Sequence, residues 1–391
     1  MTGSSTAGGA TTPPATTPPA TNHQSAAPLH HMHIPTAART IPAAGVHGGD
    51  VEIVATALGV DPSTILDLSA SMNPAATDPL PIVYRHLRAG LDRYPNPARA
   101  HAALAEAMGI DEDQLLLTNG GAEAISLVAA EIGGRVVEPA FALHPRGGGP
   151  LWRANPGSPS GLLAAASERA DVWDEAFYSL ATGEWTRGDD GIAVGSLTKL
   201  LAAPGLRIGY ILADPEFIVT CRMRQPGWSV NGLVCAALPD LLQSVDLSAS
   251  AHAVAELRSE LVALLASYHL ATRPSDVNWV LVDAPGLRET LAPQGVLVRD
   301  CSSFDLPGVA RIAVPDAGGL ARLDTALARS AALGSLAPRD GTTPTDTRSL
   351  GTTPHRTAPT RTKPQGATPA LVTPQGTTSA GSMTTEDKDA R

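Results

Sequence analysis

The sequence predicts an α/β fold in which a large, mixed but mostly parallel sheet domain precedes a smaller α+β domain. Two observations lead to this prediction. Short continuous apolar runs alternate with helical segments in the first part of the chain, and such runs are typical of strands in a parallel sheet covered on both faces. After a long helical stretch, strand-like runs return and indicate a second sheet.

Helices and strands of the large domain are predicted from periodicity. Apolar residues at helical spacing predict helices over residues 98–109 and 121–132. The second helix begins directly after Asn119-Gly120, and asparagine favours helix starts. Continuous apolar runs predict four buried strands, at residues 135–138, 170–173, 191–195 and 207–213.

The smaller domain begins with helical patterns over residues 229–245 and 251–270. Pro239 lies inside the first of these, so we expect a kink or break there. Strands are then predicted in three runs, at residues 277–284, 295–300 and 309–314. A last helix is expected over residues 317–333.

Composition divides the 391-residue chain into five parts. Small residues, threonine and proline dominate residues 1–44 and 337–391, which cannot bury enough apolar surface to offset chain entropy. We expect these two segments to be disordered, low-complexity tails. Between them the predicted order is an N-terminal arm with part of the small domain (45–85), the large domain (86–235) and a C-terminal small domain (236–336).

Several classes of protein are disfavoured by the composition. The net charge of -10 and the aromatic content of 4% do not suit a nucleic-acid-binding surface. There is no leader-like start and no apolar run near the ~18 residues that span a bilayer, so we expect a cytoplasmic protein without a membrane partner. Three cysteines without paired spacing argue against disulfides or a zinc site. The His-rich run at residues 30–33 lies in a tail, so no functional metal site is expected.

One segment, GSLTKLLAAPGLRIGY at residues 195–210, concentrates reactive groups. Lys199 carries an amine at the end of a strand-like run, and Ser196, Thr198 and Arg207 could donate hydrogen bonds to an anion. Asp174 also follows a strand-like run, where ligands commonly bind in open α/β sheets. An amine, a carboxylate and donors for a dianionic phosphate are what a pyridoxal phosphate site requires.

A second candidate for anion binding is the helix start in TNGGAE, residues 118–123. Gly120, Gly121 and Ala122 would present free backbone amides and the positive end of the helix dipole. Taken singly, each of these features also fits an ordinary helix cap, loop or turn. Their joint occurrence favours a cofactor site.

These motifs resemble fold-type I pyridoxal phosphate enzymes, in the branch of histidinol-phosphate aminotransferases and threonine-phosphate decarboxylases. The superfamily is marked by three blocks, SLTK (196–199), GLRIGY (205–210) and DEAF (174–177). Three other blocks favour the decarboxylases, namely HGGD (47–50), WSVN (228–231) and RDCSSF (299–304). Matching blocks extend over nearly all of residues 45–315.

The resemblance implies roles for individual residues. Lys199 would attach the cofactor covalently, and Asp174 would hold a proton on its pyridine nitrogen. Asn155 would bind the cofactor's phenolic oxygen or the substrate carboxylate. The cofactor's phosphate would be held by Gly121, Ala122, Ser196, Thr198 and Arg207. The large domain, residues 86–235, would therefore bind pyridoxal 5'-phosphate.

A second set of residues resembles the one that binds the substrate. His47 in the N-terminal arm, with Arg299 and Arg311, would hold the phosphate and carboxylate of a phosphorylated amino acid. Two separated anions on a small substrate require at least two cationic or bidentate donors. Tyr210 ends the GLRIGY block, and its role stays open. Fold-type I enzymes usually form dimers, so we expect a homodimer.

The reaction implied by the resemblance is decarboxylation of L-threonine O-3-phosphate to 1-amino-2-propanol O-phosphate, for cobalamin biosynthesis. The enzyme would hold the bond from the alpha carbon to the carboxylate perpendicular to the cofactor ring. An aminotransferase would instead break the alpha-hydrogen bond. Two alternatives remain open: a histidinol-phosphate-type aminotransferase and a degenerate, non-catalytic relative.

The chain departs from the family pattern between Pro139 and Asn155. Glycines and prolines in PAFALHPRGGGPLWRAN leave no room for another strand and helix, since a parallel crossover takes about a dozen residues or more. We therefore expect a shortened large domain. His144 stands where an aromatic ring would stack on the cofactor if PAFALH is the stacking block, and Phe141 and Trp152 are the other candidates.

Overall fold

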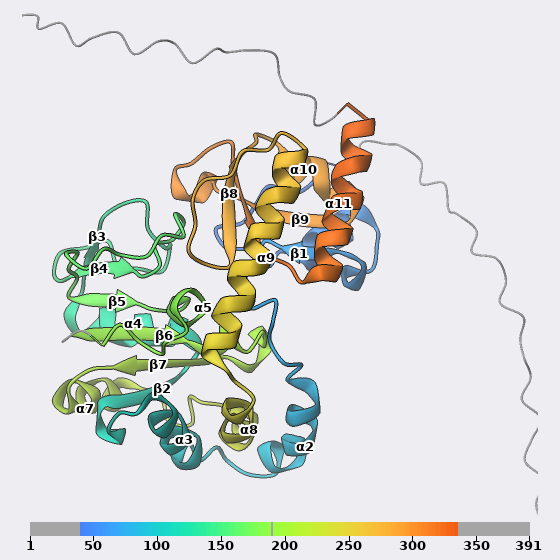
Figure 1. Ribbon diagram of the computed structural model, residues 1–391. Coiled ribbons are helices and arrows are strands. Elements are labelled where there is room, and N and C mark those ends of the chain that lie inside the picture. Colours follow the sequence, from blue (N-terminus) through green and yellow to red (C-terminus); the bar gives the residue numbers. More distant parts are fainter. Residues whose placement is uncertain (1–39, 189–190, 335–391) are drawn as a thin grey trace, which may run out of the picture. The chain divides into compact units, whose positions relative to one another are not determined.

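The computed structural model describes residues 40–188 and 191–334, which form two β-sheets with helices packed against them (Figure 1). Most of the two predicted tails, with the His-rich run at residues 30–33, lies outside the described residues. Among the helices of the described ranges, none is long and apolar enough to cross a membrane.

The larger sheet has six strands in the order β2-β7-β6-β5-β4-β3. Their bounds are β2 (Leu115–Asn119), β3 (Arg135–Val136), β4 (Leu151–Ala154), β5 (Val172–Asp174), β6 (Ile192–Ser196) and β7 (Ile208–Leu212). Strands β3 to β6 are parallel, and β7 is antiparallel to both of its neighbours. A mixed, mostly parallel sheet is therefore confirmed, and each of the four predicted strands overlaps an observed one.

Strand β4 corrects one expectation. The sequence left no room for another strand and helix between Pro139 and Asn155, yet a strand, β4, forms there and pairs in parallel with both β3 and β5. Residues 137–150 connect β3 to β4 without a helix, so a loop rich in glycine and proline makes the crossover alone. At this place the large domain lacks the helix of a usual parallel crossover but keeps the strand.

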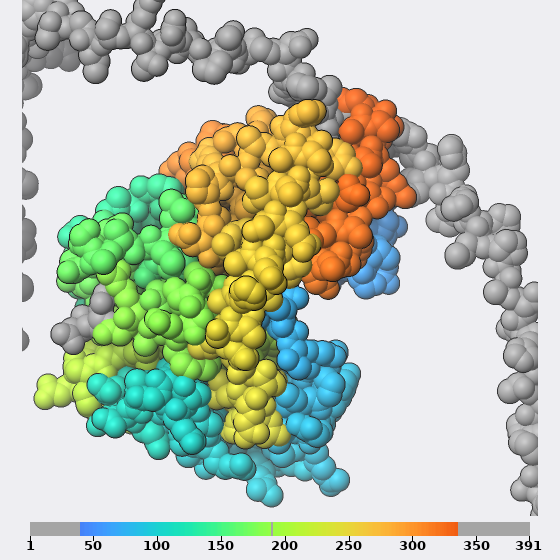
Figure 2. Space-filling model, viewed as in Figure 1, coloured from blue at the N-terminus to red at the C-terminus, as the bar shows by residue number. Residues whose placement is uncertain are grey.

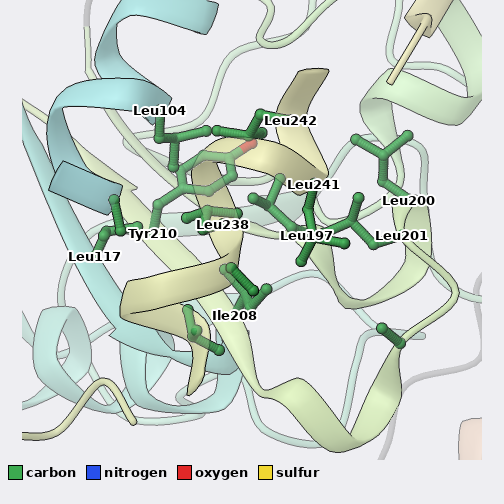
Figure 3. Close-up of a cluster of buried hydrophobic side chains, with 14 of the residues drawn as sticks. Leu104, Leu117, Leu197, Leu200, Leu201, Ile208, Tyr210, Leu238, Leu241 and Leu242 are labelled. Atoms are coloured by element: carbon green, nitrogen blue, oxygen red, sulfur yellow. The ribbon is translucent and has the colours of Figure 1, made fainter. Parts of the chain in front are cut away.

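Helices cover both faces of the larger sheet. They are α2 (Leu80–Leu91), α3 (Ala98–Met108), α4 (Gly120–Ile132), α5 (Tyr178–Thr182), α6 (Leu197–Leu200), α7 (Pro215–Arg224) and α8 (Gly232–Gln243). One core joins Leu117 and Tyr210 of the sheet to α3 and α8 (Figure 3). The adjacent Leu116 and Ile211 pack in a different core, with α4 and α7. Burial on both faces explains why these strands are continuous apolar runs.

The smaller sheet has the strand order β1-β9-β10-β8. Its strands are β1 (Leu66–Leu68), β8 (Trp279–Asp283), β9 (Val296–Asp300) and β10 (Val309–Ala313), and its helices are α1 (Val51–Leu58), α9 (Leu247–Ser267), α10 (Leu287–Leu291) and α11 (Ala317–Ala332). Strand β1 comes from the N-terminal part of the chain and pairs in parallel with β9. The three predicted strands of this sheet are confirmed, while the domain boundaries themselves stay a prediction.

Helix α9 contributes to the cores of both sheets. Val254 packs into the core of the larger sheet, whereas Leu261 and Leu265 pack into that of the smaller one. In Figure 2 the side chains of α9 (yellow) and α11 (orange) form a continuous surface over the smaller sheet. Short 3-10 turns occur at Pro62–Thr64, Glu112–Gln114, Pro204–Leu206, Ala292–Gln294 and Ser302–Phe304.

A kink or break was expected at Pro239, and α8 shows that no break occurs there, while the kink stays a prediction. The helix continues from Gly232 to Gln243 with Pro239 inside it. Proline removes one backbone donor from the helix, but tertiary packing can offset that loss. Buried residues on both sides of the proline, including Leu238 and Leu241, hold the two halves of the helix against the core.

Candidate active site

A cavity of about 330 Å³ lies where the larger sheet, the N-terminal arm and the smaller sheet meet. Ten of the eleven predicted site residues line it: His47, Gly121, Ala122, Asp174, Ser196, Thr198, Lys199, Arg207, Arg299 and Arg311. They come from segments far apart in the sequence, and the fold brings them together around one space.

Asn155 is the predicted site residue that is not part of the cavity lining, although Ala154 and Pro156 beside it are. Its backbone amide donates to the Asp174 carbonyl at 2.8 Å, and its side-chain Oδ1 accepts from the Ala164 amide at 3.0 Å. These bonds join two loops at the edge of the cavity. A contact of Asn155 with cofactor or substrate stays a prediction.

The start of α4 forms an anion cradle with Arg207. Gly120 has a φ of +76°, and a Cβ there would lie 2.5 Å from Nη2 of Arg207, so only glycine admits the guanidinium this close. The amides of Gly121 and Ala122 belong to the first helical turn, where backbone donors lack partners within the helix. Thr198 adds a buried hydroxyl without a hydrogen-bond partner in the described part of the chain.

Ser196 caps α6, and its hydroxyl already makes two hydrogen bonds within the protein. Its Oγ accepts from the Thr198 amide at 3.3 Å and donates to the Ile208 carbonyl at 3.3 Å. These two bonds fix the turn that leads from β6 to Lys199. An incoming anion would have to compete with the Ile208 carbonyl for the hydroxyl proton of Ser196.

Lys199 is the amine of the cavity and the only lysine among the first 362 residues. Burial lowers its pKa to about 8, with further lowering from Arg311 and Arg207. No acidic side chain in the described ranges forms an ion pair with it, and its Nζ lies 6.0 Å from the centroid of the Phe177 ring. A substantial share of neutral amine near pH 8 suits a nucleophile that attacks an aldehyde.

Asp174 is held by His144 at the carboxyl end of β5. The His144 Nε2 lies 2.8 Å from Oδ2 of Asp174, and the Ala176 amide donates to Oδ1 at 3.0 Å. Both residues of the pair are buried, with exposed fractions of 3% for His144 and 9% for Asp174. The carboxylate is thus oriented by a second side chain, which the sequence alone did not indicate.

The structure distinguishes the three residues that were candidates for stacking on the cofactor ring. His144 lies against Asp174 and does not line the cavity. The expectation that His144 stacks on the cofactor ring is therefore wrong. Trp152 is buried in the core and donates its indole N–H to the Gly133 carbonyl at 3.0 Å. Phe141 does line the cavity and contacts the His144 ring edge-on at 5.6 Å. Phe141 is therefore the candidate that can face a bound ring.

Arg299 and Arg311 present two buried cations side by side. They are directly opposed partners in the antiparallel pair of β9 and β10, and each is 6% exposed. Burial lowers the pKa of both guanidinium groups, and each Nε lacks a partner within the described residues. Like charges directly opposed in a sheet are destabilising, so this arrangement favours a bound anion.

Each of the two arginines is in contact with an aromatic ring. The Arg299 guanidinium carbon lies 4.5 Å from the Phe304 ring centroid, and that of Arg311 lies 4.9 Å from the ring of Trp279. Arg299 also donates to the carbonyl of Val46 in the N-terminal arm at 2.8 Å. The rings fix the orientation of the guanidinium groups without neutralising their charge.

The N-terminal arm brings His47 to the cavity. Arg288 anchors the arm, donating to the Pro42 carbonyl and to Oδ2 of Asp50, both at 2.6 Å. The His47 ring lies 5.7 Å from Phe141 of the larger sheet domain. Burial, and then the nearby Arg299, lower the pKa of His47, so a neutral imidazole is expected near pH 7.

Tyr210, whose role the sequence left open, lies in the hydrophobic core of α3 and α8 (Figure 3). It does not line the cavity. Burial, with a contribution from nearby carboxylates, raises the pKa of its phenol well above the usual range. Tyr210 therefore stays protonated and has a packing role.

Comparison with known proteins shows which family and which relatives the chain resembles. The family model of aminotransferase class I and II matches residues 154–329. Threonine-phosphate decarboxylase of Salmonella typhimurium is 29% identical over 364 residues, covering 75% of this chain and 98% of the relative. Histidinol-phosphate aminotransferase 2 of Pseudomonas fluorescens is also 29% identical, over 333 residues, covering 69% and 90%.

Solved structures agree on the fold. Histidinol-phosphate aminotransferase from Sinorhizobium meliloti, solved in complex with pyridoxal-5'-phosphate, has a TM-score of 0.61 and 16% identity, and the match covers 71% of this chain and 94% of that one. This likeness supports a fold-type I architecture. Together, the matches in sequence and structure show that the chain is similar to the aminotransferase class I and II family, whose model matches residues 154–329.

Proposed function

We propose that this protein is a pyridoxal phosphate-dependent enzyme that decarboxylates L-threonine O-3-phosphate, in cobalamin biosynthesis. The observation that carries the proposal is the presence of two separate sets of anion donors in one cavity with Lys199 and Asp174. One set is the cradle at the start of α4, and the other is the opposed pair Arg299 and Arg311. A cofactor phosphate and an anionic substrate account for both sets.

The residues of the cavity fit pyridoxal phosphate. The orphaned hydroxyl of Thr198, the Arg207 guanidinium and the first-turn amides of α4 suit a dianionic phosphate. The Asp174 carboxylate suits a protonated pyridine nitrogen, and the Lys199 amine suits the aldehyde. Because all of these groups line one cavity, the degenerate, non-catalytic alternative is disfavoured.

When bound, the cofactor supplies an electron sink for the pair of electrons released at the substrate's alpha carbon. Asp174, oriented by His144, would hold a proton at the ring nitrogen and so favour electron withdrawal. Arg299 and Arg311 would hold the substrate's anionic groups and thereby set which bond to the alpha carbon breaks. As carbon dioxide leaves with cleavage of the carbon–carbon bond, Lys199 or a water would deliver a proton to the alpha carbon.

The size of the cavity favours threonine phosphate over histidinol phosphate. About 330 Å³ lies near the lower end of the usual range for small-molecule sites, ~300–1,000 Å³, and it must admit cofactor and substrate together. Threonine phosphate has no ring, whereas histidinol phosphate adds an imidazole. The aminotransferase remains the second candidate, because a relative of that name is as similar in sequence as the decarboxylase.

A pair of assays on the cofactor-loaded protein tests the proposal. We expect carbon dioxide release from L-threonine O-3-phosphate and no amino transfer from histidinol phosphate to 2-oxoglutarate. The Lys199→Ala variant should do neither. Amino transfer without carbon dioxide release would support the second candidate. The homodimer that the resemblance implies and the cytoplasmic location expected from the sequence remain proposals.

A further inference from the structure

The loop between β3 and β4 carries two side chains of the active site on a backbone without helix or strand. It spans residues 137–150, and within it Phe141 lines the cavity while His144 contacts Asp174. We propose that Arg146 is a positioning residue, whose guanidinium holds this loop so that Phe141 and His144 lie in place before pyridoxal phosphate binds. The inference rests on the proposed function, since it concerns the cofactor end of the same cavity.

The guanidinium of Arg146 is surrounded by oxygen atoms of its own loop. It makes five hydrogen bonds, which is as many as it has N–H groups. The acceptors are a carboxylate and four carbonyls, namely Oε1 of Glu138 (2.7 Å) and the carbonyl oxygens of Ala140 (3.3 Å), Phe141 (3.3 Å), Ala142 (3.0 Å) and His144 (2.8 Å). One side chain therefore binds most of the turn that carries the two active-site residues.

The loop requires such a side chain because it has no helix to pair its backbone. In a usual parallel crossover the helix satisfies its carbonyls internally, whereas this short loop must find other donors. A planar guanidinium offers donors in a fixed fork, which suits several carbonyls around one point. Glu138 fixes the fork from the other end, since its Oε2 also accepts from the Ala140 amide at 2.8 Å.

His144 depends on this support because its ring is held by a hydrogen bond at one nitrogen. Nε2 lies 2.8 Å from Oδ2 of Asp174, while Nδ1 has no partner within the part of the chain that the structure describes. The position of the ring is therefore set largely by the His144 backbone, whose carbonyl accepts from Arg146. A shift of the loop would move the group that orients the Asp174 carboxylate.

Phe141 depends on the same hydrogen bonds. Its ring centroid lies 5.7 Å from that of His47 and 5.6 Å from that of His144. An apolar ring makes no strong directional bond of its own, so the backbone decides where it faces the cavity. That backbone is held at the Phe141 carbonyl, which accepts from Arg146 and from the His144 amide. Side chains that become ordered only when a ligand binds lower its affinity.

Chemical modification of the cofactor-free protein tests the positioning without an activity assay. His144 is 3% exposed, so diethyl pyrocarbonate should leave it unmodified in wild type and label it in Arg146→Ala, as mapped by mass spectrometry. The His101 side chain in α3, 15% exposed, is the internal reference and should be labelled equally in both proteins. The Arg146 side chain is 42% exposed, so its truncation leaves no buried cavity and the melting temperature should stay close to that of wild type.

Titration with pyridoxal phosphate measures the consequence at the cavity. Arg146→Ala should raise the Kd about tenfold, since two side chains must then be ordered on binding. Arg146→Lys should raise it nearly as much, because an ammonium keeps the charge beside Glu138 but cannot reach four carbonyls. In a Phe141→Ala background the same Arg146→Ala change should have a much smaller effect, which a general structural role would not produce.

The matched control is Arg169→Ala. Arg169 also donates to carbonyls of its own loop, those of Ala166 at 2.6 Å and Glu168 at 3.0 Å, but it does not line the cavity. We expect this variant to bind pyridoxal phosphate as wild type does and to keep His144 unmodified.

The outcomes separate the two proposals. The role of Arg146 would be overturned by an unmodified His144 in Arg146→Ala, by an unchanged Kd, or by a general loss of stability that also increases labelling of His101. Wild-type values in Arg146→Lys, or a full effect in the Phe141→Ala background, would overturn it too. A wild type that binds no pyridoxal phosphate would overturn the proposed function, while the labelling of His144 still decides whether Arg146 holds the loop.

Discussion

Replacing Arg311 by methionine should affect stability and substrate binding in opposite directions. In the cofactor-free protein Arg311 is a buried cation opposite Arg299 and without an acidic partner among the described residues. Methionine has a similar length and can keep the contact with the Trp279 ring. Exchanging buried charge for a well-packed apolar side chain stabilises by ~1–4 kcal/mol, so the melting temperature should rise by a few degrees.

The same substitution should weaken substrate binding strongly. A hydrogen bond to a charged group contributes about 1.5–3 kcal/mol, so loss of even one raises the Kd for threonine phosphate ~10- to 150-fold. Calorimetric melting of the cofactor-free protein and titration of the loaded protein measure the two effects. A stabilised variant that no longer binds substrate would identify Arg311 as an anion-binding residue.

Arg288 provides a matched control. It is also a buried arginine, at 2% exposed, but it pairs with Asp50 and the Pro42 carbonyl. Arg288→Met leaves Asp50 without its guanidinium and should destabilise the protein by ~3–5 kcal/mol. If Arg311→Met lowers the melting temperature in the same way, Arg311 stabilises the cofactor-free protein, and the claim that its charge is uncompensated until an anion binds is refuted.

Three further predictions concern the cofactor side. His144→Phe should lower kcat about tenfold or more with cofactor still bound, because Asp174 loses its 2.8 Å partner; an unchanged kcat would exclude that role. Gly120→Ala should raise the Kd of pyridoxal phosphate about tenfold or more, since its Cβ displaces Arg207; equal titration curves would contradict this. Between about pH 8 and 10.5 the unfolded chain keeps a proton on Lys199 that the folded, cofactor-free protein releases, so the stability of wild type should rise with pH relative to that of Lys199→Met in urea melts. Parallel pH profiles of the two proteins would contradict this.

Most strands that the sequence predicted are buried on both faces, where apolar residues run without interruption. Strand β3 is a predicted strand that is not buried, and β2 is a buried strand that was not predicted. Strand β4 was missed because Arg153 interrupts a run of only four residues, and because its short crossover has no helix to signal a parallel pair. The continuity of α8 through Pro239 was also not predictable, since it depends on packing against the core.

The candidate site followed largely from motifs, and the structure brings most of these residues to one cavity. The link between His144 and Asp174 was hidden because only the pairing of β4 with β5 and the loop before it bring residues 144 and 174 together. The position of Arg146 was hidden in the same way, since its hydrogen bonds to four carbonyls of its own loop exist only in the folded chain. One available signal was the scarcity of lysine, which leaves Lys199 as the sole amine side chain of the described residues.

Attachment of pyridoxal phosphate to Lys199 is the central claim, and borohydride reduction tests it most directly. The purified protein is incubated with pyridoxal phosphate, scanned in the visible range, reduced, and mapped by mass spectrometry beside Lys199→Ala. We expect an absorption band that reduction removes, and a pyridoxyl label on Lys199 that the variant lacks. A colourless protein, or label confined to Lys363 and Lys388, would contradict the account.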